Sequence, residues 1–221
     1  MSWQHRKSPT EDLKMVRPLK LYNHAVAPNP RRVRIFAAEK GIELALEDVD
    51  VLTGQTRTPE FLAKNSSGAV PVLELDDGSY LSESVAICRY LEGIQPEPNL
   101  LGRDLREQAE IEKWNRRMEL ELFAPIARTF QNTSPLFQSR FRQFPEYGEA
   151  QRAVAHQRLE RMDQELDGHE FVAVDRFTIA DITALVAIDI GKRLAQIEIN
   201  SKLAHLNRWH ATMSDRASAR A

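Results

Sequence analysis

The groups best suited to ligand binding lie in one stretch of the chain, which runs from Val70-Pro71 to Glu83-Ser84. Proline has no N–H to donate to a β-ladder, so the presence of Pro71 at the start of an apolar strand needs an explanation. A cis Val70-Pro71 bond provides one, because it leaves the N–H and C=O of Val70 free to pair with an extended peptide. Ser84 follows at a helix start, where backbone N–H groups and a hydroxyl hold a carboxylate, while Glu83 pairs with an amino group.

Taken together and in this order, these groups predict a site for a peptide that carries an α-amino acid zwitterion. Taken one at a time, each of them also fits a strand edge followed by an ordinary serine helix cap.

The elements that must position this stretch read as a small α/β unit. Asp76-Asp77-Gly78-Ser79 predicts a tight hairpin that joins a strand over 69–75 to a strand at 80–81. The other predicted elements are strands at 18–22 and 43–51, the latter half-buried, and helices over 31–40, 58–64 and from 82 onward. The resulting order β-α-β-α-β-β-α fits a βαβ crossover followed by a hairpin and a packing helix, which is the thioredoxin-like layout.

The second half of the chain is predicted to be an all-α helical bundle. A stripe of apolar residues at steps of three or four begins at Ile111, and Pro125 is expected to kink that helix. A second stripe lies at 155–166, a helix over 178–194 is apolar nearly all round, and a final helix covers 201–213. We therefore expect an α/β domain over 17–93, a proline-containing linker over 94–103 and a helical domain over 104–221.

Composition narrows the class of protein. The fraction of hydrophobic residues, 42%, is ordinary for a globular protein. The net charge is −2, so the chain has no excess of positive charge that would favour nucleic-acid binding. The six histidines lack metal-ligand spacing, and no apolar run approaches the roughly 20 residues that span a membrane. One cysteine, Cys88, fits a reducing compartment, and its apolar neighbours indicate inert packing. Residues 1–16 lack a secretory signal and read as a disordered or extension segment. We expect a cytoplasmic protein without a metal, nucleic-acid or membrane partner.

Over residues 18–213 the chain resembles the cytosolic glutathione transferases. The stretch VPVLELDDGSYLSES followed by AICRYLE is similar to that family's glutathione site. The resemblance implies that Glu83 and Ser84 bind the γ-glutamyl end of glutathione and that Val70, next to Pro71, binds the cysteinyl backbone. It also implies a basic partner for the glycyl carboxylate, for which Arg57 and Lys64 are the candidates. The segment Thr178-Ile179-Ala180-Asp181 resembles the family's structural capping box.

The catalytic position departs from the common pattern of the family. Many members place a Tyr, Ser or Cys after the first strand, whereas the matching position here is Ala27. Asn29 remains as a donor to sulfur beside the first helix, with a helix-capping role as the alternative interpretation. Tyr22 is expected to face the core, and His24 to lie on the surface.

The chain most resembles a fungal and bacterial class that lacks a catalytic Tyr, Ser or Cys. Members of that class activate sulfur through a held water and the dipole of the first helix. The stretches FLAKNSSGAVPVLELDDG and RRMELELFAPIARTF carry this similarity. A Ser and a His one turn apart accompany the water in those relatives, and the matching positions here are Ala127 and Gln131. Gln131 or Asn132 is a weak replacement.

Two functions are compatible with this sequence. The first is conjugation of glutathione, as co-substrate, to small hydrophobic electrophiles held against residues 118–130, with reduction of disulfides or peroxides as a variant. The alternative is a non-catalytic interaction module of the same fold, which Ala27 favours and the intact Val70-Pro71 and Glu83-Ser84 groups oppose. The resemblance also implies a homodimer that joins the first domain of one chain to the helical domain of the other.

Overall fold

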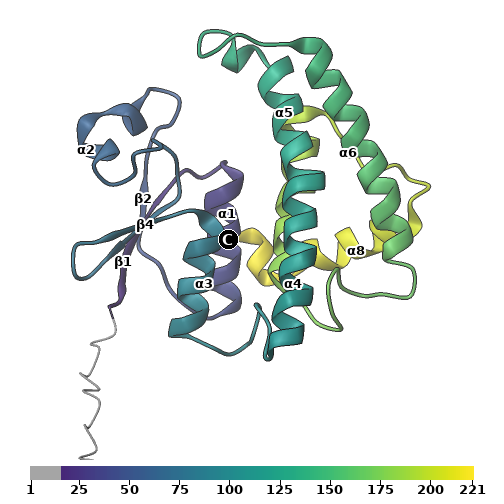
Figure 1. The fold of residues 1–221 in the computed structure, drawn as a ribbon, viewed down its shortest axis with the longest axis horizontal. Coiled ribbons are helices and arrows are strands. Elements are labelled where there is room, and N and C mark those ends of the chain that lie inside the picture. The colour runs from purple at the N-terminus through teal and green to yellow at the C-terminus, as the bar shows by residue number, and fades with distance from the viewer. Residues whose placement is uncertain (1–15) are drawn as a thin grey trace, which may run out of the picture.

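The computed structural model describes residues 16–221, so the expected extension lies outside the described residues apart from Val16. The first half of the chain is a four-stranded sheet with helices on both faces (Figure 1). The sheet order is β2-β1-β3-β4, in which β2 is parallel to β1 and the other pairs are antiparallel. The elements are β1 (Pro18–Asn23), α1 (Pro28–Glu39), β2 (Leu46–Asp48), α2 (Pro59–Leu62), β3 (Val72–Leu75), β4 (Tyr80–Ser82) and α3 (Ser84–Ile94). The predicted thioredoxin-like order is confirmed.

Alternating side chains of the central strands separate the two faces of the sheet. Leu21 and Leu73 are buried in the main core, to which α1 and α3 also contribute. Tyr22 and Val72 point to the opposite face, where they pack against Phe61 of α2. The expected core position of Tyr22 is therefore confirmed.

The prediction of a half-buried strand over 43–51 is wrong in its extent. Only Leu46–Asp48 form β2, and all three residues are exposed. The reason is topological, since β2 is an edge strand that pairs with β1 alone. Period-two alternation in the sequence does not reveal whether a strand has one neighbour or two.

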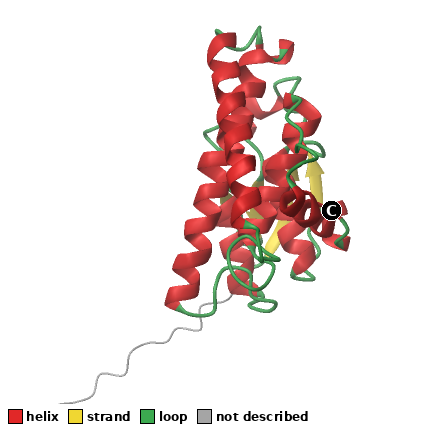
Figure 2. Cartoon of the chain, turned by 90° about the vertical axis from the view of Figure 1, so that its right-hand side faces the viewer, coloured by secondary structure: helices red, strands yellow, loops and turns green. Residues whose placement is uncertain are grey.

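The second half is helical and comprises α4 (Leu105–Arg117), α5 (Ala124–Thr133), α6 (Pro145–Glu165), α7 (Ile179–Ile190) and α8 (Ala204–Ser214). The long helices run side by side in Figure 2. The irregularity expected at Pro125 is a π-helical turn at Met118–Phe123, which joins α4 to α5 directly before the proline. Because proline has no N–H and crowds the preceding turn, a wider turn there accommodates it.

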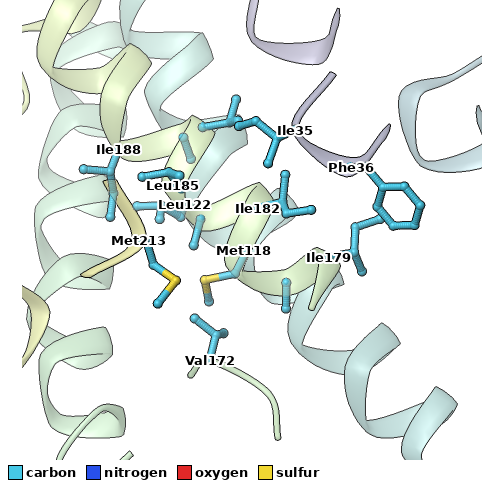
Figure 3. Packing of buried hydrophobic residues seen from close by; sticks show 14 of the residues in the cluster. Ile35, Phe36, Met118, Leu122, Val172, Ile179, Ile182, Leu185, Ile188 and Met213 are labelled. Atoms are coloured by element: carbon cyan, nitrogen blue, oxygen red, sulfur yellow. The ribbon is translucent and has the colours of Figure 1, made fainter. Parts of the chain in front are cut away.

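Helix α7 occupies the centre of the helical half, as predicted from its apolar composition. Residues 179–188 are all buried, and Figure 3 shows Ile182 of α7 near Ile35 of α1 and Met118. The capping box is present: Thr178 accepts from Ala180 N, and Asp181 accepts from Thr178 N at 3.0 Å. One apolar core thus continues from the sheet through α1 and α3 into the helical half. Over residues 16–221, no helix has the length and apolar character needed to cross a bilayer.

Candidate functional site

Strand register gathers the predicted groups at one end of the sheet. Tyr22 pairs with Val72, and Val72 pairs with Ser82, in two antiparallel ladders. Val70 lies two residues before β3 and Ser84 two residues after the end of β4, so both lie at this end of the sheet. Because β1 is antiparallel to β3, the last residues of β1 lie at this same end of the sheet. Helix α1 starts a few residues later. Three predicted features therefore meet here: the Val70-Pro71 bond, the start of α3 and the start of α1.

The Val70-Pro71 peptide bond is cis. No group within residues 16–221 forms a hydrogen bond with the backbone N–H or C=O of Val70, which is half-buried. The loop before it is held by Asn65, whose Nδ2 donates to Ala69 O at 2.8 Å and whose Oδ1 accepts from Ser67 N. A fixed peptide unit without a partner is what pairing with an extended peptide requires. Sequence reasoning missed the bracing role of Asn65.

Glu83 and Ser84 form the junction between β4 and α3. Glu83 is the N-cap residue and has φ +68° and ψ 113°, a backbone conformation that residues other than glycine rarely adopt. Its carboxylate is exposed, and none of the described residues bonds to it. Ser84 is the first residue of α3 and is buried. The first N–H groups of an α-helix have no acceptor within the helix, so this junction presents both donors and a free carboxylate.

Arg32 of α1 is a member of this site that sequence reasoning missed. Its Nη1 donates to Ser84 Oγ at 2.7 Å, and its side chain is 1% exposed. Burial lowers the pKa of the guanidinium, and the nearby Glu119 carboxylate opposes that shift. A signal was present in the sequence, because Arg32 precedes the buried residues Ile35 and Phe36 by three and four positions and so shares their helix face.

The two candidates for the glycyl carboxylate lie in different places. Arg57 covers Gly68, in the loop that leads to Val70, and its Nη1 donates to Ser67 O at 3.1 Å. A side chain at Gly68 would meet that Nη1 at 2.7 Å. Lys64 instead donates to Tyr80 Oη at 3.0 Å. Arg57 therefore adjoins the loop before Val70, whereas Lys64 is engaged with a residue of β4.

Asn29 lies at the edge of a cavity of about 260 Å³ between the two halves of the chain. Ala127 and Gln131 line the same cavity, and so do apolar residues of four segments: Pro28, Phe123, Ile126, Phe130, Phe137, Ile190 and Leu194. The alternative that Asn29 caps α1 is wrong, since Ala27 is the N-cap and no side chain caps this helix. Asn132, by contrast, is committed to the bonds from its Nδ2 to Arg128 O and from Phe144 N to its Oδ1.

The other groups that could react do not line this cavity. Cys88 is fully buried, and desolvation raises the pKa of its thiol to about 12, which makes it inert at neutral pH. His24 is half-buried and is not among the residues that line the cavity. Within the described range 16–221, no three His, Cys, Asp or Glu side chains are grouped so as to hold a metal ion.

Comparison with known proteins identifies the family of this chain. Residues 26–94 match the model of the glutathione S-transferase N-terminal domain, and residues 125–217 match that of the C-terminal domain. The chain is 34% identical over 216 residues to glutathione S-transferase 2 of Saccharomyces cerevisiae, which covers 94% of this chain and 90% of the relative.

Solved structures show the same similarity. A glutathione S-transferase domain-containing protein of Marinobacter aquaeolei VT8 is 38% identical with a TM-score of 0.86, covering 90% of this chain and 99% of that one. Gtt2 of Saccharomyces cerevisiae is 33% identical with a TM-score of 0.86, covering 91% and 99%. A class Gtt2 enzyme of Vibrio parahaemolyticus is 32% identical with a TM-score of 0.80, covering 90% and 94%. The chain therefore belongs to the glutathione S-transferase family.

Proposed function

We propose that this protein conjugates the thiolate of glutathione to small hydrophobic electrophiles in the cytoplasm. The observation that carries the proposal is the unpaired peptide unit of Val70, which lies at the same end of the sheet as Ser84 at the start of α3. An extended peptide whose first residue is an α-amino acid zwitterion satisfies both features at once.

Each part of glutathione then has a partner in the chain. The backbone of Val70 pairs with the cysteinyl residue, and the start of α3 with Ser84 binds the γ-glutamyl carboxylate. The exposed carboxylate of Glu83 binds the ammonium group. For the glycyl carboxylate we favour Arg57 over Lys64, because Arg57 lies at the loop before Val70.

The sulfur is proposed to lie at the start of α1, beside Asn29. Pro28 and Pro30 have no N–H, and Arg31 N bonds to Ala27 O, so Asn29 supplies the free backbone donor of the first turn as well as a side-chain amide. A cysteine thiol with a pKa of about 8.5 is about 3% thiolate at pH 7. Lowering that pKa by about one unit, within the range of a helix terminus and nearby donors, raises the fraction to about 24%.

The second substrate is proposed to occupy the cavity beside Asn29. Phenyl and aliphatic side chains form most of its lining, which suits an apolar electrophile. With an aryl chloride, the thiolate sulfur attacks the ring carbon, a C–S bond forms and the C–Cl bond breaks. Chloride leaves with the bonding electron pair, and the thiol proton has already passed to solvent. With a small disulfide, the same thiolate bonds to one sulfur while the S–S bond breaks and the other half leaves as a thiolate. With a peroxide, it bonds to one oxygen while the O–O bond breaks and an alkoxide leaves. A second glutathione thiolate then attacks the glutathionyl sulfur, which forms glutathione disulfide and releases the remaining half as thiol or water.

Calorimetric titration tests the binding half of the proposal. Glu83→Gln and Ser84→Ala are each expected to weaken glutathione binding by about 1–3 kcal/mol, because each leaves a charged ligand group without its partner. Glu60→Gln on α2, which removes an exposed carboxylate, is the control and should bind normally. Unchanged affinity in both site variants would remove the assignment of this site.

Turnover of a chlorinated nitrobenzene, of small disulfides and of organic peroxides tests the catalytic half. Conjugation that depends on Glu83 and Ser84 supports the transferase. Glutathione binding without turnover of any of these substrates favours the interaction module. We further propose that the protein acts as a homodimer, because partly exposed apolar side chains of β4 and α3 line a hollow on the surface of the first domain.

A further inference from the structure

The segment 134–144, which we call the strap, connects α5 to α6 and forms the loop at the top of Figure 1. Side chains hold both of its ends to the helical half. Gln143 Nε2 donates to Ser134 O at 2.7 Å. Phe144 N donates to Asn132 Oδ1 at 3.0 Å. The beginning and end of the strap are therefore fixed to each other and to α5.

The middle of the strap reaches the first domain through one side chain. Arg140 Nη2 donates to Val51 O and Leu52 O at 3.2 Å each. In the described part of the chain, these two carbonyl oxygens accept no other hydrogen bond, and no other hydrogen bond or ion pair joins the strap to the first domain. Arg140 alone thus ties the strap to the turn at 51–54, which leads towards Arg57.

Phe137 gives the strap a place in the proposed electrophile cavity, since it is the one strap residue that lines this cavity. Its ring lies edge-on to that of Phe130 of α5, with 5.2 Å between the ring centroids, and 5.5 Å from the ring of Phe141. The guanidinium carbon of Arg140 lies 5.8 Å from the centroid of the Phe137 ring. The residue that forms part of the cavity wall therefore lies beside the residue that ties the strap to the first domain.

We propose that Phe137 determines the size of the electrophile that the cavity accepts, and that Arg140 is a positioning residue that holds the strap, and with it Phe137, across the cavity. This inference rests on the proposed conjugation reaction. The other lining residues belong to α1, α5, α7 or the π-helical turns, whereas Phe137 lies in a connection between helices, which yields more easily than packed helices. A one-ring electrophile fits beneath Phe137, whereas a larger ring system must displace the strap and break the bonds of Arg140.

The bonds of Arg140 also connect the strap with the proposed glutathione site. The turn at 51–54 is followed by a short helix over Gln55–Arg57, and Arg57 is the residue proposed to bind the glycyl carboxylate. A ligand that engages Arg57 restricts this segment and favours the arrangement in which the turn carbonyls face Arg140. Bound glutathione should therefore steady the strap through Arg140.

A contact without any effect on the reaction is the competing explanation, because polar contacts between exposed groups often contribute little. Arg140 is exposed, so Arg140→Gln leaves the core intact and should fold normally. A loss of activity alone would not separate the two explanations. The test must ask whether the enzyme's selectivity for electrophile size changes.

A chlorodinitrobenzene and the chlorodinitronaphthalene with the same substitution pattern provide that test. Each kcat/KM is divided by the rate constant of the uncatalysed reaction with glutathione, which removes the difference in chemical reactivity. The unmodified enzyme should favour the one-ring substrate. Phe137→Ala should reduce that preference by roughly 10-fold or more, as expected when an apolar pocket gains room for several carbon atoms. Arg140→Gln should reduce it by about 3-fold, since the strap keeps Phe137 but loses its bonds to the first domain.

Amide hydrogen exchange in peptides of the strap tests the role of Arg140 without turnover. Glutathione should slow exchange in the strap of the unmodified protein, and Arg140→Gln should remove that response. Arg140→Lys keeps a cation at this position and should retain part of it. Arg142→Gln is the matched control, because Arg142 is an exposed cation of the strap that lies over the ring of Phe144 and forms no bond with the first domain. It should match the unmodified protein in both experiments.

An unchanged preference between the two electrophiles in Phe137→Ala would overturn the role assigned to Phe137. A strap that responds to glutathione in Arg140→Gln as it does in the unmodified protein would overturn the role assigned to Arg140. Failure of the unmodified protein to turn over either electrophile is a different outcome, because it rejects the proposed conjugation and the role of Phe137 with it. If glutathione does not bind either, strap exchange in the ligand-free variants decides on Arg140: it must be faster in Arg140→Gln than in Arg142→Gln, and equal exchange overturns the proposal.

Discussion

Asn29 provides the residue-scale test of how sulfur is activated. Asn29→Ala should raise the pKa of the bound glutathione thiol by about one unit, because it removes one donor and leaves only the terminus of α1. The thiolate absorbs in the ultraviolet, so a pH titration of the complex measures this pKa directly. Glutathione affinity should hardly change, since Asn29 is not assigned to the glutamyl or glycyl ends.

The complementary variant is Ala27→Ser. A serine there supplies the helix cap that α1 lacks, worth about 1 kcal/mol of stability, and adds a hydroxyl at the position where many relatives carry one. It should lower the thiol pKa and raise kcat/KM at neutral pH. A thiol pKa that is the same in both variants would exclude this end of α1 as the place where the sulfur binds.

Residues of the proposed site stand out in the sequence when they carry a local signature. A proline at the start of an apolar strand and an acidic residue before a serine at a helix start are such signatures, and the structure has a cis bond and a helix start at these positions, at one end of the sheet. Arg32 was missed because an arginine run is usually a solvated helix face, and only its spacing to Ile35 and Phe36 contradicts that. The preference for Arg57 over Lys64 could not be predicted from the sequence, because it depends on how loop 65–69 folds.

At the scale of elements, most helices and strands followed from periodicity and turn residues. The sheet hairpin and α7 were predictable because Asp-Gly turns and uninterrupted apolar composition are strong signals. The π-helical turn at Met118–Phe123 was not, since the sequence indicates only that Pro125 disturbs the helix. That turn contains Phe123, which lines the cavity, so a site-forming detail lies in the irregular segment.

The start of α4 is predicted to confer a pH-dependent stability. Glu107 receives a two-pronged ion pair from Arg176, which also donates to Asn99 in the linker, and Arg103 N donates to the same carboxylate. The Arg176 guanidinium, followed by that backbone donor, lowers the pKa of Glu107 to about 2. A carboxyl whose pKa is lower in the folded state stabilises the fold above its unfolded pKa of about 4.5 and loses that effect as pH falls towards the folded value.

Glu107→Gln should therefore lower Tm near neutral pH, and the difference from the unmodified protein should shrink progressively below about pH 4.5. Thermal unfolding followed by circular dichroism across that range measures it. Glu112→Gln on the same helix, whose carboxylate lies 3.9 Å from an exposed Arg89, should change Tm little at any pH. A Glu107→Gln deficit that stays constant with pH would show that the ion pair is not its source.

At the scale of the whole molecule, α1 connects the two halves. Its inner face enters the shared core, and its polar residues bind the helical half. Arg31 pairs with Asp189 of α7 and also donates to Ala219 O, and Glu39 pairs with Arg216 after α8. The first turn of α1 carries the proposed sulfur position, and Arg32 follows it on the same helix. Contacts with the core and with the helical half both fix the position of α1. Local sequence patterns predicted both halves but not these long-range ion pairs, whose partners lie more than 150 residues apart.

The proposed homodimer follows from apolar surface that the single chain leaves uncovered. A shallow, mainly apolar hollow on the outside of the first domain is lined by Leu81 of β4 and by residues of α3: Ala86, Arg89, Tyr90, Gly93 and Ile94. A contiguous patch of this kind is typical of an association surface.

Introducing a charge there, as in Ala86→Glu, should convert the dimer to a monomer at micromolar concentration, because a carboxylate would lose its water in the interface without gaining a partner. Sedimentation velocity measures the change, with Ala153→Glu at another exposed helical alanine, on α6, as the control outside the patch. A protein that sediments as a monomer before any substitution, or a dimer unaffected by Ala86→Glu, would contradict this assignment of the interface.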